Sequence, residues 1–375
     1  MSAFEVTDPS LPVLALDIGG TKMAAGLVTS DGDVLAVERT PSPARGSAEE
    51  MYGALTGLCD SLFAATGQQE VAGVGVGCAG PMVWPDGVVS PVNIPGWRGY
   101  PLRRNLAKRF PGVPVRIHND AIAMAAAEHW MGAAAGYANA LGMVVSTGVG
   151  GGLIVDDQIV NGGLGNAGHI GHVVVNPEGP ACGCGGRGCL EAIARGPATA
   201  AWAVEQGWTP RRADAPADAK TLAEDARNGD PIGIAAYRRA GEAVGIALAS
   251  VAALLDLDIA VIGGGLVQSG DLLMVPMRHA FEEHAGMAFV QRMTIVPAGV
   301  GAPVGGGGGG AVGGAGGVGG GEAGGGGAGS RGGGVVREAG GGDAGRRRGG
   351  VGVVGARGGG GGRGDLPGVL GGARR

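Results

Sequence analysis

The alternation of hydrophobic and polar positions near the start of the chain predicts three short strands. Apolar runs occupy residues 13–16, 23–28 and 34–38, and each has the length of a strand. The segments between them read IGGT and SDGD, which are rich in residues that favour tight turns. We therefore expect three strands joined by two turns.

Strands and helices alternate through the rest of the first 300 residues. Helices are predicted at 47–66, 121–131 and 271–284, with helical spacing also through 197–256, and strands at 71–77, 113–120, 258–267 and 293–298. Residues 140–155 repeat the strand, glycine turn and strand of the opening, and residues 79–101 form a loop rich in Pro and Gly. Interleaved strands and helices favour the α/β class over separate α and β blocks.

The composition changes sharply at residue 301. About half of residues 301–375 are glycine, against the ~7% of ordinary domains, and none is aromatic. Such a segment cannot bury enough apolar surface to offset the cost of ordering the chain. We expect this tail to be disordered.

Charge and cysteine usage narrow the class of protein. The 375 residues carry a formal net charge of −5, which points to neither nucleic acid nor a membrane surface. The start of the chain lacks a signal-peptide pattern, and no apolar run reaches the ~20 residues of a membrane helix. Five cysteines do not form a disulfide framework in a chain of this length. We expect a cytoplasmic protein with reduced thiols.

Three of the five cysteines fall within eight positions. Cys182, Cys184 and Cys189 follow the pattern C-x-C-x4-C, and His172 lies ten residues before the first of them. Three thiolates and one imidazole are a common closed ligand set for tetrahedral zinc. The alternative is a group of buried or redox-active thiols. Because four protein ligands leave no open coordination position, we predict a structural zinc ion.

Glycine clusters follow three of the apolar strands. Glycines allow close backbone approach to phosphate, and exposed N–H groups can bind its oxygens, while a carboxylate can hold Mg²⁺ through water. A single Gly-Gly turn is most often only a hairpin, but ligands of open α/β sheets bind beyond the carboxyl ends of strands. Residues 148–152 would form a flexible turn, preceded by the hydroxyl donors Ser146 and Thr147. The candidate phosphate-binding residues are Asp17, Gly19, Gly20, Thr21, Lys22, Thr147, Gly148, Gly150, Gly264 and Gly265.

Several polar residues are candidates for contact with a second ligand. Asp120 ends an apolar strand, where it could be a general base or simply a helix cap. Asn93 could bind a polyol, or could be only a turn residue before Ile94 and Pro95. His169 and Glu191 flank the cysteine cluster, which could present them to a ligand.

Together these motifs resemble the ROK family (repressors, open reading frames, kinases), which includes bacterial sugar kinases of the actin-like ATPase, or ribonuclease H-like, fold. The resemblance spans residues 12 to about 298. It is carried by LDIGGTKMAAGLV, NIPGW, HNDAIAMAAAE, VSTGVGGGLIV, GNAGHIGHVVV, CGCGGRGCLEAIA and IGGGLV.

The resemblance implies an N-terminal lobe at 1–120 and a C-terminal lobe at 121–300, with ATP and a sugar in the cleft between them and the tail at 301–375. It implies that Asp17–Lys22 and Thr147–Gly152 line the phosphates of Mg-ATP, and that Asp120 activates the sugar hydroxyl. Zinc would bind His172, Cys182, Cys184 and Cys189, and the chain would form a homodimer. The implied sugar contacts are Asn93, Asn119, His169, His172 and Glu191.

Two departures from the family pattern affect this interpretation. Glucose-phosphorylating members usually have Glu where this chain has His169, whereas the family's N-acetylmannosamine kinases resemble this chain at that position. The substrate is therefore expected to be one of these two sugars, with His169 favouring the amino sugar. After residue 298 the family usually continues with an Asp-Ala-Gly turn and a terminal helix, which the Gly-rich tail replaces; a frame error would account for it.

Three other functions can be compared with a sugar kinase. A repressor of the family carries a DNA-reading helix pair, and about a dozen residues before the first strand are too few for one. The tail's Arg-Gly segments resemble weak RNA binders, but without aromatic residues they lack base stacking. A non-catalytic sugar sensor is the remaining alternative, against which Asp120 and the intact glycine turns argue.

Overall fold

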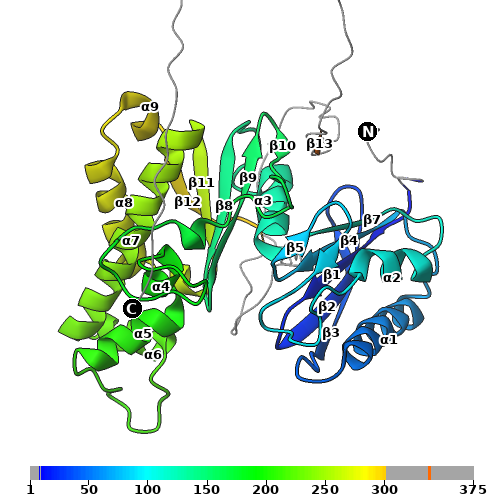
Figure 1. Cartoon of the computed structure of the whole chain (residues 1–375), viewed down its shortest axis with the longest axis horizontal. Helices are drawn as coiled ribbons and strands as arrows, with labels where there is room; N and C mark the ends of the chain where they lie inside the picture. The colour runs from blue at the N-terminus through cyan, green and yellow to red at the C-terminus, as the bar shows by residue number, and fades with distance from the viewer. Residues whose placement is uncertain (1–7, 9, 301–336, 339–375) are drawn as a thin grey trace, which may run out of the picture. The chain divides into compact units, whose positions relative to one another are not determined.

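The computed structural model describes residue 8, residues 10–300 and the pair 337–338. Within this part, two mixed β-sheets carry the architecture, and helices pack against them (Figure 1). Apart from the pair 337–338, the tail lies outside the described residues, so the expectation that it is disordered concerns residues that the structure does not describe. The predicted α/β class is confirmed.

The first sheet contains the three strands predicted at the start of the chain. Its strand order is β3-β2-β1-β4-β7, with β1, β2 and β3 antiparallel and β1, β4 and β7 parallel. The strands are β1 (Val13–Ile18), β2 (Lys22–Val28), β3 (Val34–Pro41), β4 (Gly73–Cys78) and β7 (Val115–Asn119). Helix α1 (Ala48–Thr66) begins with a capping box in which Ser47 and Glu50 bond reciprocally. Helix α2 (Leu102–Arg109) was not expected from the sequence.

The second sheet has the strand order β12-β11-β8-β9-β10-β13. Its strands are β8 (Ala140–Val145), β9 (Val149–Val155), β10 (Gln158–Ile159), β11 (Ile259–Gly263), β12 (Thr294–Pro297) and β13 (Arg337–Glu338). From β8 to β12 it repeats the order and the directions of the first sheet, strand for strand. This repetition supports the interpretation of two half-similar units.

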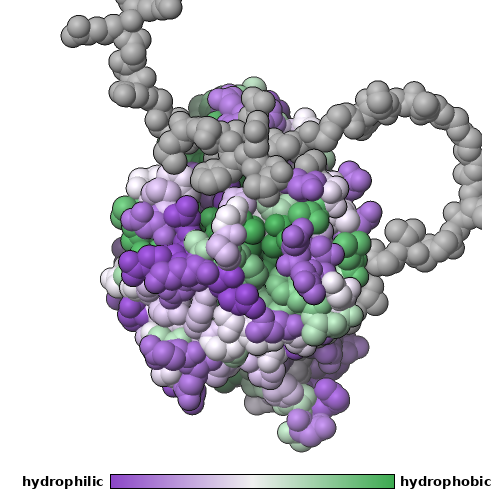
Figure 2. Space-filling model, turned by 90° about the vertical axis from the view of Figure 1, so that its right-hand side faces the viewer, coloured by the Kyte–Doolittle hydropathy of each residue, from purple (hydrophilic) through white to green (hydrophobic). Residues whose placement is uncertain are grey.

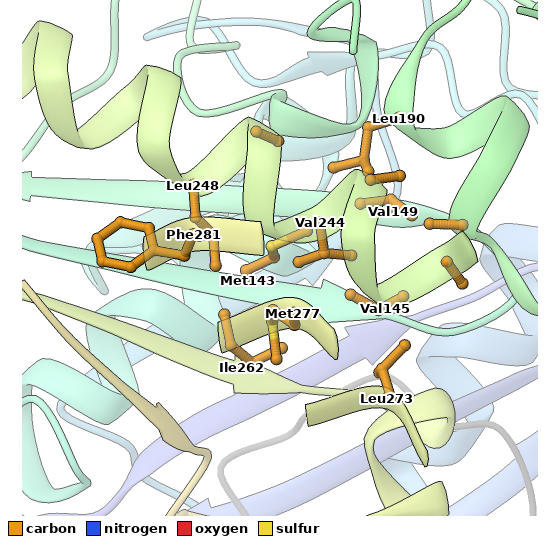
Figure 3. Close-up of a cluster of buried hydrophobic side chains, with 14 of the residues drawn as sticks. Met143, Val145, Val149, Leu190, Val244, Leu248, Ile262, Leu273, Met277 and Phe281 are labelled. Atoms are coloured by element: carbon orange, nitrogen blue, oxygen red, sulfur yellow. The ribbon is translucent and has the colours of Figure 1, made fainter. Parts of the chain in front are cut away.

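Helices of the second half build the larger hydrophobic core. They are α4 (Leu190–Ala194), α5 (Gly196–Glu205), α6 (Ala219–Arg227), α7 (Pro231–Leu255), α8 (Asp271–His284) and α9 (Ala288–Gln291), with 3-10 turns η1 (Ile170–His172) and η2 (Gly265–Ser269). Helix α3 (Asp120–Met131) instead contributes Ile122 to a smaller buried cluster on the second sheet. Val244 and Leu248 of α7 and Met277 and Phe281 of α8 pack with the sheet residue Met143 (Figure 3). The predicted helical region 197–256 is interrupted at residues 206–218 and at residues 228–230, and each break contains a glycine with a left-handed φ, Gly207 (97°) and Gly229 (88°).

The loop at residues 79–101 contains structure that the sequence did not reveal. Two short strands, β5 (Met82–Val83) and β6 (Val88–Val89), pair in antiparallel fashion within it. Strands of two residues leave too short a pattern of alternation to be recognised.

The expectation of a flexible glycine turn at residues 148–152 is wrong for most of that stretch. Gly150, Gly151 and Gly152 belong to strand β9. A Cβ atom on Gly152 would lie 2.6 Å from Cα of Ile122, which is on helix α3. Gly150 and Gly152 therefore let α3 pack directly on the sheet backbone, and only residues 146–148 make the turn.

Glu128 is a fully buried carboxylate that joins helix α3 to the end of the described body. It accepts hydrogen bonds from the backbone N–H groups of Ala133 (2.8 Å), Gly299 (3.1 Å) and Val300 (2.8 Å). Substituting Glu128→Ala should lower the free energy of unfolding by about 2–4 kcal/mol, because buried N–H groups lose their acceptor. Urea denaturation measures this, with the exposed Glu242→Ala as a control expected to cost under about 0.5 kcal/mol. Equal losses in both variants would contradict the prediction.

The surface of the described residues is mixed in character. Hydrophilic residues occupy much of the face in Figure 2, and hydrophobic residues gather in a smaller area of it. Among the described residues, no helix combines the length and the apolar character that crossing a membrane requires.

Candidate active site

Two carboxylates lie at one edge of the first sheet. The parallel strands β1, β4 and β7 bring Asp17, Gly77 and His118 into register, so the strands end side by side. Asp17 is the penultimate residue of β1 and is 6% exposed. Asp120 directly follows β7 as the first residue of helix α3. The fold therefore brings the two predicted acidic residues to the same edge.

The N-cap of helix α3 is Asn119, and not Asp120. The Asn119 side-chain oxygen accepts a hydrogen bond of 3.0 Å from the N–H of Ala121. One oxygen of Asp120 accepts from the same N–H group at 2.8 Å. The alternative that Asp120 serves only as the helix cap is therefore wrong, because Asn119 occupies the N-cap position.

Burial raises the pKa of both carboxyl groups. The pKa of Asp17 rises to about 6 because burial disfavours its charge; the nearby charge of Asp120 raises it further, and Lys22 and Arg39 lower it in part. The pKa of Asp120 also rises through burial, against the N–H of Ala121 and the nearby His169, which lower it. A buried carboxylate with a raised pKa is a better proton acceptor than an exposed one.

Asp17→Asn should stabilise the protein at neutral pH. Because the pKa of Asp17 is raised from 3.8 to about 6, its protonated form favours folding below pH 3.8, and this contribution is lost as the pH rises through 6. At ~1.36 kcal/mol per pH unit, the variant should gain up to about 3 kcal/mol at pH 8 and nothing near pH 4. Urea denaturation across this range, without nucleotide, tests it, with the exposed Asp86→Asn as control. A pH-independent difference between Asp17→Asn and the parent would contradict the prediction.

The turn after β1 is held by a residue that the sequence analysis missed. The N–H of Gly19 donates to the carbonyl of Lys22 at 3.1 Å. The Ser42 hydroxyl donates to the Gly19 carbonyl at 2.7 Å, and the Ser42 N–H donates to the Thr21 carbonyl at 2.9 Å. Ser42 is 23 residues away from this turn, so no local pattern connects them.

Asn93 lies against this turn. A Cβ atom on Gly20 would come within 2.8 Å of the Asn93 amide, so only glycine leaves room for this contact. The Arg98 guanidinium donates to the carbonyls of Pro91, Val92 (3.3 Å) and Ile94 (3.4 Å), which bracket Asn93. Arg98 thus fixes the loop that carries the amide, a role that the sequence analysis did not assign.

The turn after β8, at residues 146–148, lies against Glu191 and against Gly264 and Gly265, which follow β11. The N–H of Val149 donates to the Glu191 carboxylate at 2.9 Å, so this predicted ligand-binding residue also holds the turn. Gly264 has a φ of 99°, and its Cβ would lie 2.4 Å from the carbonyl oxygen of Val145. The ends of β8 and β11 therefore touch. The turn residue Thr147 is exposed.

His169 lies close to the side chains of Asn119 and Asp120. An ideal Cβ on Gly80 would lie 2.8 Å from the Asn119 amide nitrogen and 3.6 Å from Nε2 of His169, so both side chains meet over Gly80. His169 is close enough to Asp120 to lower the pKa of that carboxyl group. Nδ1 of His169 is buried and has no hydrogen-bond partner in the part of the chain that the structure describes. A polar ligand at this point would meet an imidazole, an amide and a carboxylate.

The cysteine cluster has the geometry of a metal site. One ligand atom from each of four residues lies within 4.8 Å of all the others, and the residues are His172, Cys182, Cys184 and Cys189. The separations are 3.8 Å from Cys182 Sγ to His172 Nδ1 and 3.7 Å from Cys184 Sγ to Cys189 Sγ. Zinc–sulfur bonds of about 2.3 Å at tetrahedral angles place the sulfurs about 3.8 Å apart. The predicted Cys₃His set therefore fits a tetrahedral metal ion.

The two halves, their glycine turns and the paired carboxylates define the class of the protein: an actin-like ATPase fold with a candidate site formed by both halves. The family model described as "ROK family" matches residues 13–315. The chain belongs to the ROK family. Similar proteins that are sugar kinases confirm the predicted class of enzyme, a sugar kinase.

Three similar proteins cover most of this chain. The glucokinase of Thermotoga maritima is 32% identical over 299 residues, which are 77% of this chain and 92% of that protein. The N-acetylmannosamine kinase of Shigella flexneri is 35% identical over 276 residues, covering 73% and 90%. The crystal structure of a ROK family glucokinase from Streptomyces griseus, in complex with glucose and AMPPNP, has 32% identity and a TM-score of 0.66, covering 77% and 94%.

Proposed function

We propose that this protein transfers the γ-phosphoryl group of Mg-ATP to the primary hydroxyl of a hexose or an N-acetylhexosamine. The observation that carries the proposal is the environment of Asp120. It is a largely buried carboxylate with a raised pKa at the carboxyl end of β7, beside His169 and beside the helix cap Asn119. That arrangement suits a base facing a sugar hydroxyl.

In this mechanism Asp120 accepts the proton of the sugar hydroxyl. The hydroxyl oxygen forms the new bond to the γ-phosphorus as the bond from that phosphorus to the bridging oxygen of ADP breaks. Mg²⁺ bound with the nucleotide supplies charge neutralisation for the phosphates. The glycine turns after β1 and β8 offer backbone N–H groups to phosphate oxygens, and Asp17 would hold the magnesium through water.

Zinc is the metal that we assign to the cysteine cluster. The cluster fills four positions with three thiols and one imidazole, which leaves no position for substrate. The cluster begins at His172, three residues after His169, and ends at Cys189, two residues before Glu191. The zinc would therefore fix His169 and Glu191, two of the predicted sugar contacts, by holding the backbone between them.

The identity of residue 169 bears on the choice of sugar. A neutral imidazole makes one donor and one acceptor contact, whereas a carboxylate only accepts. We propose N-acetylmannosamine as the first sugar to test and glucose as the second. One relative of each kind, at 35% and 32% identity, supports keeping both.

A coupled assay of ADP release over a panel of hexoses and N-acetylhexosamines tests the proposal. ADP release that requires both Mg²⁺ and one sugar of the panel is the expected result. Saturable sugar binding without ADP release would instead favour the non-catalytic sensor. Release of ADP that is independent of any sugar would reject both functions.

A further inference from the structure

Two segments that are far apart in the chain run alongside each other next to the candidate site. The first is the stretch 80–84, which contains strand β5, and the second is the stretch 164–169, which ends at His169. The N–H of Trp84 donates to the carbonyl of Leu164 at 3.0 Å. This contact brings the loop of the first half against the segment that carries the imidazole.

One side chain makes most of the polar contacts between the two segments. The Asn166 side-chain oxygen accepts from the N–H of Met82 at 3.2 Å, and its amide nitrogen donates to the carbonyl of Met82 at 2.9 Å. The same nitrogen donates to the carbonyl of Leu164 at 3.1 Å. A single amide therefore pairs both backbone groups of Met82, which no hydroxyl or alkyl side chain could do in this geometry.

The two glycines on either side of Asn166, Gly165 and Gly168, also make close contacts. Gly165 has a φ of 80°, and a Cβ atom there would lie 2.3 Å from Cβ of Trp84. Further along, a Cβ on Gly168 would lie 2.8 Å from the carbonyl oxygen of Gly151 in strand β9. The backbone of residues 165–168, which leads to His169, is therefore in close contact with Trp84 at one end and with strand β9 at the other.

His169 is held between two attachments. On one side Asn166, three residues earlier, bonds to Met82. On the other side His172, three residues later, belongs to the cysteine cluster, with its ring centroid 6.2 Å from that of His169. A metal ion would fix only the second side.

We infer that Asn166 is a positioning residue that sets the imidazole of His169 over Gly80 and Asn119. The inference rests on the proposed function, in which His169 contacts the sugar. Without the Asn166 amide, the Met82 backbone groups lose their partner and the segment 164–169 is free to shift. Displacements of about 1 Å are enough to weaken a hydrogen-bonding site substantially.

Steady-state kinetics of four variants tests this role. Asn166→Ala should raise the sugar KM by about tenfold while the ATP KM and kcat stay within about twofold, an order-of-magnitude expectation for a lost orienting contact. Leu164→Ala is the matched control in the same segment, because its side chain is 60% exposed, and it should behave like the parent. In the His169→Ala background, adding Asn166→Ala should raise the sugar KM no further. Independent, multiplied effects of the two substitutions would overturn the inference.

A readout without catalysis separates this inference from the proposed function. Hydrogen exchange at the Met82 and Trp84 amides should become faster in Asn166→Ala and stay unchanged in Leu164→Ala; unchanged exchange in both variants would overturn the inference. If the parent protein releases no ADP but binds sugar, the proposed catalysis fails and the same comparisons are made with sugar dissociation constants. If His169→Ala keeps the parent KM, or the parent binds no sugar, the positioning role is overturned as well.

Discussion

Asp120→Asn should reduce turnover by about a thousandfold while leaving the fold and the metal content unchanged. The substitution keeps the shape of the side chain and its contact with the N–H of Ala121, but it removes the group that accepts the proton. General-base catalysis contributes about 10²–10⁴-fold, and a buried carboxylate beside the acceptor hydroxyl belongs to the upper part of that range. ADP release under saturating sugar and Mg-ATP measures the effect.

The matched control for this experiment is Asp60→Asn. Asp60 is an exposed carboxylate that pairs with Arg109 on the surface, so its loss should change turnover by less than about twofold. Sugar affinity measured by calorimetry should change little in Asp120→Asn, which would separate a lost base from a damaged site. An Asp120→Asn protein that retains a tenth or more of the parent turnover would reject Asp120 as the base.

Loss of the metal should be the second large effect. Cys184→Ser removes one of the four donors, and we expect less than about a tenth of the parent's zinc content. The ligand set joins residue 172 to residues 182–189, and metal binding contributes directly to the stability of the segment it closes. We therefore expect unfolding at a lower temperature and a sugar affinity reduced by about tenfold or more, since His169 lies next to this segment.

Elemental analysis, thermal unfolding and calorimetric sugar binding measure these three changes. Cys59→Ala is a suitable control, because Cys59 is a buried thiol of helix α1 and no part of the cluster, and it should keep one zinc per chain. Chelation of the parent protein should reproduce the Cys184→Ser result, and added zinc should reverse it. Full zinc content in Cys184→Ser would show that the cluster is not the metal site.

Several features of the site were correctly anticipated because their signals are local. The strands β1, β2 and β3 follow from apolar runs separated by turn residues. The cysteine cluster follows from the spacing of Cys182, Cys184 and Cys189, since nearby glycines let the chain turn tightly enough to bring them together. The structure places His172, the predicted fourth member, beside these three cysteines.

Other features depend on contacts that no local pattern encodes. The sequence left open whether Asp120 was a helix cap, and the structure gives that position to Asn119. The glycines of β9 were expected in a flexible turn, although two of them, Gly150 and Gly152, let helix α3 approach the sheet. Both outcomes depend on what packs against the residue in three dimensions.

The sequence by itself determined the α/β class, the duplicated strand pattern, the family and the set of residues available for chemistry, because periodicity and short motifs are properties of neighbouring positions. The tertiary structure alone decided which residues hold those groups in place. Three side chains do this through hydrogen bonds to backbone carbonyls or N–H groups: Ser42 bonds to the turn after β1, Arg98 to the loop around Asn93, and Asn166 to Met82. Polar side chains of these types occur throughout the sequence, so only the folded chain determines which of them lie close enough to a backbone group to bond to it.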